Sequence, residues 1–325
     1  MRIKIIILIL LSICMNIYAQ VEIESTINDV KYNINLIKFY IDKGEYDNAL
    51  EYIDKTLEES SVKDSLFFLK GIIYRQREDW LQASEFFAKS ILYSSEEQII
   101  IDRLLEFELA IFLVSPLSAF DIVSISVTKA QTSQKQMGFL NILAKLYENN
   151  QLYGEANDVY KTILQETDET EKCDLQIKII TNNIFQKDYI TAIENLEPLI
   201  AHNDSIYIGK LLFLNYISNV SLENYDEAKS SLIRLYLDYP NNVNKDEMLS
   251  GLADIFEIQG KYLISWFMLN ELFKISNEVQ KFKIQNDIER IKRKICEIKA
   301  IGDQFEYFKP VFELEKQHHA TDDIE

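Results

Sequence analysis

The feature that most constrains the fold is a small residue that returns at a nearly constant interval along the chain. "GEYDNALEYI" at residues 44–53 is followed by "EDWLQASEFF" at residues 78–87, and in both segments an aromatic residue stands three positions before an alanine. The series of small residues is Ala49, Ala83, Ala119, Ala156, Ala192, Ala228 and Ser265, with steps of 34, 36, 37, 36, 36 and 37. Such a period predicts a stack of similar repeats, each of which contacts only its neighbours.

Each small residue has companions at fixed distances. The residue three positions before it is Tyr46, Trp80, Pro116, Tyr153, Tyr189, Tyr225 or Tyr262. The residue four positions after it is Ile53, Phe87, Val123, Tyr160, Leu196, Leu232 or Leu269. A spacing of three or four keeps these residues on one face of a helix.

A second small-aromatic pattern precedes the first in several repeats. Gly71 and Tyr74 stand twelve and nine residues before Ala83. The same distances separate Ala144 and Tyr147 from Ala156, and Ala253 and Phe256 from Ser265. Small residues at these positions let two helices approach closely, while the aromatic residues fill the remaining volume.

Each repeat is therefore predicted to be two short amphipathic helices joined by a tight turn such as "DKGE", "QRED", "ENNQ" or "IQGK". The chain has only eight glycines and four prolines, so it lacks the turn residues that an all-β protein needs. Neither helix can bury its apolar stripe alone. Stacking of successive repeats along the chain solves this problem.

The repeat, together with Pro240 at the end of "YLDYP", resembles the tetratricopeptide repeat over residues 30–275. The resemblance implies an all-α, right-handed superhelix of about seven helix-turn-helix repeats with a C-terminal capping helix. Steps of 36 and 37 exceed the usual length of about 34, which implies longer helices or turns. Pro198 is expected to kink or shorten the second helix of the fifth repeat.

The N-terminus is predicted to direct export. "MRIKIIILILLSICMNIYAQ" has two cations before an apolar run, which is typical of a signal peptide at residues 1–19 that is cleaved after Ala19. A linker at residues 20–29 would follow, and the expected location is the periplasm or the cell envelope. A retained membrane anchor is the alternative, as is a lipoprotein acylated on Cys14, although Ile13 is bulky for a lipobox.

Residues 276–325 differ from the repeats. Asn277 and Gln280 form a capping-box pattern. The helix after them carries isoleucines at gaps of four and three, namely Ile284, Ile288, Ile291, Ile295 and Ile298. These residues predict a capping helix over the last repeat, followed by a mobile tail. The alternative is a coiled-coil seam that makes the protein a homodimer and a self-associating component of the envelope.

The resemblance also implies a binding surface, because the first helix of each tetratricopeptide repeat lines a concave groove that holds a peptide or a partner helix. The positions that correspond to this lining are Ile34, Ile41, Phe68, Ile72, Arg75, Ile111, Phe112, Lys145, Ile177, Ile184, Phe185, Phe213, Ile217 and Val220. Most are apolar, so they indicate a hydrophobic peptide groove or, alternatively, core packing. A subclass of the family clamps a C-terminal carboxylate with Lys, Asn and Arg. Here the corresponding positions are mostly Ile, Phe or acidic, so that activity is not expected.

The charge of the chain restricts its partners. The formal net charge is -18, and removal of residues 1–19 leaves 32 cations against 52 anions, or -20. Nucleic acid is not expected as a partner, because its binding requires a cationic surface. The acidic surface favours basic or neutral partners.

The sequence contains no motif for catalysis or for a cofactor. The glycines form no phosphate-binding loop, and the histidines are His202, His318 and His319, for which a loop or tail position is expected rather than a metal site. Cys173 and Cys296 lie more than three repeats apart, so no internal disulfide is expected. The predicted function is a non-enzymatic adaptor that binds a protein or peptide without a small-molecule cofactor.

Overall fold

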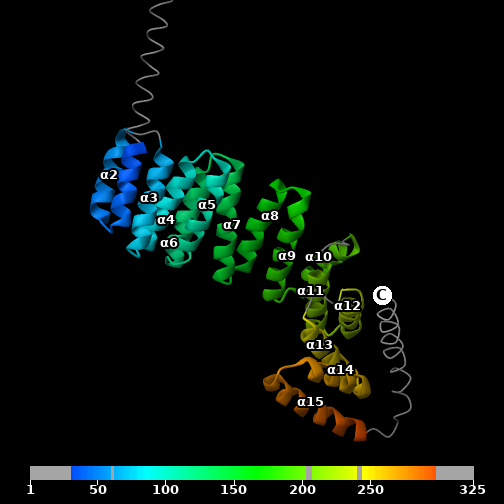
Figure 1. Ribbon diagram of the computed structural model, residues 1–325. Coiled ribbons are helices and arrows are strands. Elements are labelled where there is room, and N and C mark those ends of the chain that lie inside the picture. Colours follow the sequence, from blue (N-terminus) through cyan, green and yellow to red (C-terminus); the bar gives the residue numbers. More distant parts are fainter. Residues whose placement is uncertain (1–30, 60–61, 203–206, 240–243, 298–325) are drawn as a thin grey trace, which may run out of the picture. The chain divides into compact units, whose positions relative to one another are not determined.

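The structure is a computed structural model that describes residues 31–59, 62–202, 207–239 and 244–297 (Figure 1). Every regular element in these ranges is an α-helix. The prediction of an all-α repeat solenoid is therefore confirmed. The proposed signal peptide, the linker, Pro240, Ile298 and the tail lie outside the described residues.

The second helix of each repeat, here called the B helix, begins at the residue that the sequence pattern marked. The B helices are α2 (Tyr46–Glu59), α4 (Trp80–Tyr93), α6 (Pro116–Lys129), α8 (Tyr153–Glu166), α10 (Tyr189–His202), α12 (Tyr225–Asp238) and α14 (Tyr262–Ile275). Each of them is 14 residues long.

The first helix of each repeat, here called the A helix, precedes its B helix in the chain. In the first repeat it includes residues 31–42. The other A helices are α3 (Lys63–Gln76), α5 (Glu97–Ile111), α7 (Ser133–Asn149), α9 (Glu169–Phe185), α11 (Ile208–Ser221) and α13 (Lys245–Ile258). A further helix, α15 (Glu278–Glu297), follows the last repeat.

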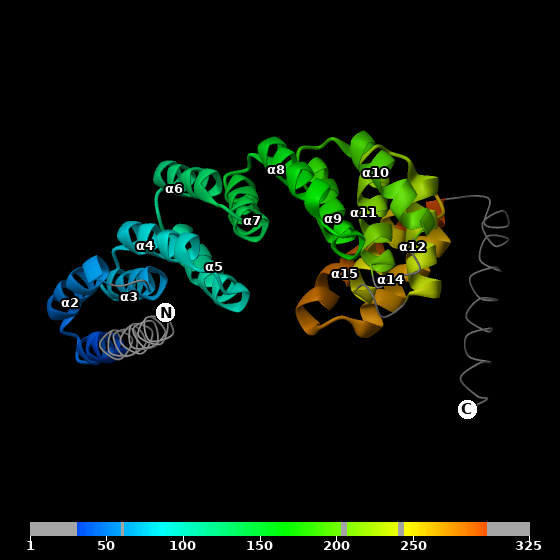
Figure 2. The same cartoon turned by 90° about the horizontal axis from the view of Figure 1, so that it is seen from above.

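The chain divides into two compact units between Glu166 and Thr167, called unit 1 and unit 2. Within each unit, consecutive helices other than α5 and α6 lie side by side and antiparallel, for example α3 against α4 in unit 1 and α13 against α14 in unit 2 (Figure 2). Each unit thus has the stacked-hairpin arrangement that the period predicts.

The recurring small residues lie at the centre of the packing. Ala119 and Ala253 are 1% exposed, whereas Ala49, Ala83, Ala144, Ala156, Ala192, Ala228 and Ser265 are completely buried. The apolar residues four positions after the B-helix small residues are also buried, from Ile53 at 0% to Leu269 at 6% exposed. The core therefore follows the period of the sequence, as predicted.

Six of the turns between the A and B helices share a backbone conformation. The residue two positions before the B helix has a positive φ, between 60° and 74°, in Gly44, Glu78, Gln151, Lys187, Glu223 and Gly260. The next residue donates its N–H to a carbonyl five residues back, as from Asp79 to Tyr74 at 2.9 Å and from Lys261 to Phe256 at 2.8 Å. This is the Schellman arrangement, which satisfies carbonyls at the end of the A helix.

The third repeat departs from this arrangement. Pro116 begins α6, and no residue between α5 and α6 has a positive φ. Both helices pack against α4 and α7 rather than along one another. Leu105 is 59% exposed on α5, and Leu109, one turn further along the same helix, is 66% exposed. This hairpin is splayed, and α5 carries leucines that lie largely in solvent.

Pro198 does not shorten its helix, so that part of the expectation from the sequence is wrong, whereas a kink at Pro198 stays a prediction. α10 contains Pro198 and has the same 14 residues as the other B helices. Pro198 and Glu194, whose carbonyl loses its usual N–H partner, are both exposed, so water can satisfy that carbonyl.

α15 covers the last repeat. Ile284, Ile288 and Ile291 are 7%, 3% and 0% exposed and belong to the hydrophobic core formed with α13 and α14, against which Ile295 also packs. The capping box forms as predicted: Gln280 N–H donates to Asn277 Oδ1 at 3.0 Å, and Asn277 N–H donates to Gln280 Oε1 at 3.2 Å. The alternative of an isoleucine seam for a homodimer is wrong for these residues, because they are already buried within one chain.

A substitution at Gly71 can test how closely α3 and α4 approach each other. A Cβ at Gly71 would lie 2.6 Å from ring carbons of Phe87, which is completely buried. Alanine favours a helix over glycine by about 1 kcal/mol, yet we expect Gly71→Ala to lower the free energy of unfolding by about 1–3 kcal/mol because of overpacking. Urea denaturation measures the change. In a Phe87→Leu background the same substitution should be neutral or stabilising, and a more stable single variant would contradict the packing argument.

The different burial of Leu69 and Leu105 predicts unequal costs when each is truncated. Leu69→Ala should lower the free energy of unfolding by about 2–5 kcal/mol, because it leaves a cavity in the core. Leu105→Ala should change it by less than about 0.5 kcal/mol, because this side chain is mostly in water. Equal losses in thermal or urea denaturation would mean that Leu105 is buried in solution.

Candidate functional site

The positions predicted to line a groove have different environments. Ile111 is 0% exposed and Ile177 is 1% exposed, so both are core residues and cannot contact a partner. Ile177 packs with Ala192 and Leu196 of α10 and with Leu211 of α11. Phe185 is 59% exposed at the end of α9. The partly exposed residues are Ile34, Ile41, Phe68, Ile72, Arg75, Phe112, Lys145, Ile184, Phe213, Ile217 and Val220.

Some of the partly exposed residues also hold the repeats together. The Phe68 ring lies 5.6 Å from the Phe87 ring, and the Arg103 guanidinium lies 5.4 Å from the Phe68 ring centre. Arg103 itself pairs with Asp64 at 2.9 Å and donates to the Ser90 carbonyl at the end of α4. Phe68 is therefore mainly a packing residue rather than a contact surface.

In unit 1, ion pairs between successive A helices occupy the predicted groove positions. Arg75 on α3 pairs with Glu106 on α5. Lys145 on α7 pairs with Glu108 on α5 at 2.5 Å. These charges compensate one another, so this surface offers few unsatisfied groups to a ligand.

In unit 2, the corresponding surface opens into a cavity of about 550 Å³ between α11, α13, the end of α14 and α15. It is called the unit 2 cavity. Its lining residues are Phe213, Tyr216, Asn244, Asp246, Glu247, Ser250, Gly251, Asp254, Leu269, Leu272, Ser276, Gln280, Lys283, Ile284 and Asp287. A volume of this size is typical of a pocket that accepts a ligand or a side chain of a partner.

The glycine in the cavity lining sets how closely α11 and α13 approach. A Cβ at Gly251 would lie 2.5 Å from the Tyr216 hydroxyl oxygen and 3.0 Å from a Leu232 methyl carbon. The absence of a side chain therefore allows the Tyr216 ring to lie over α13. One wall of the cavity is aromatic for this reason.

The charge in the cavity is strongly unbalanced. Asp246, Glu247, Asp254 and Asp287 line it against a single cation, Lys283. Desolvation raises the pKa of Asp254, as do the charges of Glu257 and Asp287. The pKa of Tyr216 is also raised, first by burial and then by the carboxylates of Asp254 and Glu247.

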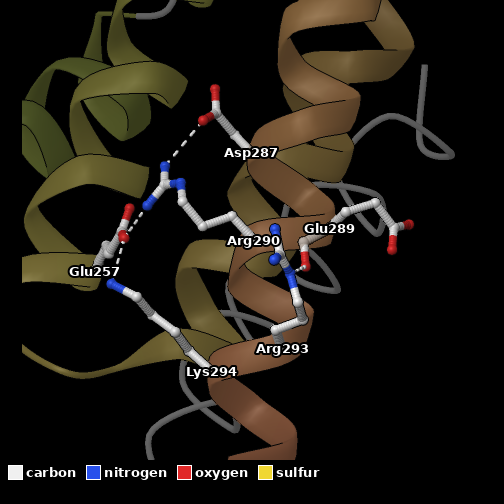
Figure 3. Close-up of polar contacts among 6 residues, drawn as sticks. All are labelled: Glu257, Asp287, Glu289, Arg290, Arg293 and Lys294. Atoms are coloured by element: carbon white, nitrogen blue, oxygen red, sulfur yellow. Dashed lines mark hydrogen bonds and ion pairs between the residues drawn. The ribbon is translucent and has the colours of Figure 1, made fainter.

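One wall of the cavity is fixed by ion pairs between α13 and α15 (Figure 3). Arg290 on α15 pairs with Glu257 on α13 and, at 2.9 Å, with Asp287. Lys294 pairs with the same Glu257 oxygen at 2.8 Å. Glu257 thus connects two cations of α15 to α13. The Arg290 guanidinium is already occupied by two carboxylates.

Of the predicted positions, only Phe213 lines the cavity. The other residues that line the cavity were not predicted from the sequence, because the list of groove positions ended at Val220 although the repeat period continues beyond it. A step of 37 residues from Phe213 and Ile217 leads to Ser250 and Asp254, both of which line the cavity. The repeat register was therefore a signal that could have found them.

The remaining sequence features give no reactive centre. The described part of the chain contains no group of three or more His, Cys, Asp or Glu side chains that could hold a metal ion. Nor does it contain a helix of the length and apolarity needed to span a bilayer. The side chains of His202 and Cys296, and all of His318 and His319, lie outside what the structure describes, so the expectations for them stay predictions.

The A–B hairpins with buried small residues and Schellman turns define the class of the protein: it has a tetratricopeptide-repeat fold and is a helical repeat scaffold. No family model matches the sequence, and no curated protein matches it.

Several solved structures are similar in fold. A tetratricopeptide repeat protein from Parabacteroides merdae is 16% identical, with 78% of this chain and 98% of that chain covered and a TM-score of 0.46. The C-terminal part of a TPR repeat-containing protein from Cytophaga hutchinsonii is 8% identical, with 77% and 98% covered and a TM-score of 0.49. The apo form of RapI is 13% identical, with 86% of each chain covered and a TM-score of 0.48.

The ion pairs of Glu257 with Arg290 and Lys294 predict that this carboxylate helps to hold α15 against α13. Glu257→Gln removes the shared partner of Arg290 and Lys294, and we expect it to lower the free energy of unfolding by about 1–2 kcal/mol. Amide exchange should rise most in α15. Glu289→Gln, which affects an exposed pair with Lys292, should cost less than about 0.5 kcal/mol. Indistinguishable exchange in the two variants would rule out this role of Glu257.

Proposed function

We propose that this protein is an exported, non-enzymatic scaffold that binds a peptide or partner protein at the unit 2 cavity. The observation that carries the proposal is the cavity itself: about 550 Å³, with aromatic and aliphatic walls and with Asp246, Glu247 and Asp254 outside any direct ion pair of the described residues. An open pocket of this volume that combines apolar walls with a few charged groups is typical of a binding site.

The sequence supports an extracytoplasmic location for this binding. Two cations precede the apolar run of residues 5–14, and "IYA" precedes Gln20, the expected mature N-terminus. We therefore place the scaffold in the periplasm or elsewhere in the cell envelope. Its partner is a protein or peptide, and no nucleic acid is involved.

The binding site is testable with a peptide library. Purified protein comprising residues 20–325 is used to select peptides from a random phage-displayed library, and the affinity of the selected peptides is measured by calorimetry. Ser250→Trp fills the cavity, and we expect it to weaken binding at least tenfold. Ser230→Trp, on the exposed surface of α12, is the matched control and should leave affinity unchanged.

Two outcomes would contradict the proposed function. One is that no peptide binds the unaltered protein. The other is that Ser250→Trp binds the selected peptides as tightly as Ser230→Trp does, with both variants folded by circular dichroism.

A further inference from the structure

We infer that the unit 2 cavity receives a lysine or arginine side chain of the partner. This inference rests on the proposed function and specifies the chemistry of the group that is bound.

Three of the four carboxylates that line the cavity form no direct ion pair within the described part of the chain. Among the ion pairs of the described part of unit 2, none involves Asp246, Glu247 or Asp254. Asp287 differs, because Arg290 pairs with it. The three remaining carboxylates line one cavity with Lys283 as the single lining cation. A cation brought by a partner would relieve the repulsion among them.

The cavity walls offer separate surfaces for the aliphatic stem and for the charged end of a basic side chain. Phe213 and Ile284 provide apolar surface, and Tyr216 provides an aromatic ring. Lysine and arginine have aliphatic stems that pack on such surface while the charged end reaches carboxylates. An aromatic ring next to the charged end adds a favourable cation–π interaction. A neutral apolar side chain could pack against the walls, but it would leave the carboxylates without a charge partner.

An acidic or phosphorylated partner does not fit. Its charge would meet Asp246, Glu247 and Asp254 with only Lys283 opposing them. Arg290 could not turn to such a ligand without leaving both Glu257 and Asp287 (Figure 3). A bare metal ion is disfavoured as well, because the described carboxylates do not converge into a group that could hold one.

The test uses peptides selected by the library and their synthetic variants. We expect every peptide that competes for the cavity to contain lysine or arginine. Replacement of that lysine by norleucine, or of that arginine by citrulline, keeps the aliphatic stem but removes the charge and should weaken binding at least tenfold. Calorimetry with the two replacements also shows whether lysine or arginine is preferred.

The receiving carboxylate is tested on the protein side. Asp254→Asn should weaken binding of the basic peptide at least tenfold, and it should cause no further loss with the neutral peptide. Asp238→Asn, which changes an exposed carboxylate on α12 near Arg234, is the matched control and should bind normally. Asp254→Asn removes a repelling charge, so we expect it to fold, which circular dichroism verifies.

Other outcomes separate this inference from the proposed function. Peptides that Ser250→Trp blocks but that bind equally well without a basic residue would overturn the inference and leave the function intact. Binding of Ca²⁺ by the peptide-free protein, if abolished by Asp254→Asn, would assign the cavity to a metal and overturn the inference too. Failure of all peptides to bind would overturn the function itself.

Discussion

Close contact between helices at the small residues is the interaction on which the rest of the structure depends. Ala83 of α4 is completely buried, and Gly71 of α3 lies so near Phe87 that even one methyl group would collide with its ring. Contact at this distance lets two 14-residue helices bury their apolar faces against each other. Isolated helices of this length are marginal in water, so each hairpin depends on its neighbours.

The third repeat shows what happens when part of this pattern is replaced. It keeps Ala119, which is buried, but has Pro116 in place of the aromatic residue and lacks the left-handed turn residue. Proline is well suited to begin a helix, and α6 accordingly starts there. The helices α5 and α6 nevertheless pack against α4 and α7 rather than along one another. The small residue is thus sufficient to place a helix, whereas close pairing within a hairpin requires the turn and the aromatic residue as well.

The sequence predicted the fold better than the site, and the reason is physical. Buried small residues tolerate few alternatives, so Ala156 and Ala228 mark their helices directly. A left-handed turn residue can be Glu78 or Lys187 as well as glycine, which hides it from inspection. Whether a residue such as Ile111 faces a groove or the core depends on the rotation of its helix against its neighbours. The repeat period does not specify that rotation closely enough.

The capping helix α15 links stability to the proposed binding. It buries Ile288 and Ile291 beneath it, as any terminal helix of a repeat array must. It also contributes Lys283, Ile284 and Asp287 to the cavity, and Arg290 pairs with both Asp287 and Glu257. Arg290 makes its ion pairs with these two carboxylates, whereas Asp254 makes none among the described residues. The ion pairs that hold α15 on the last repeat therefore leave three cavity carboxylates without a direct cationic partner, and a cation brought by a binding partner is the simplest group that can supply one.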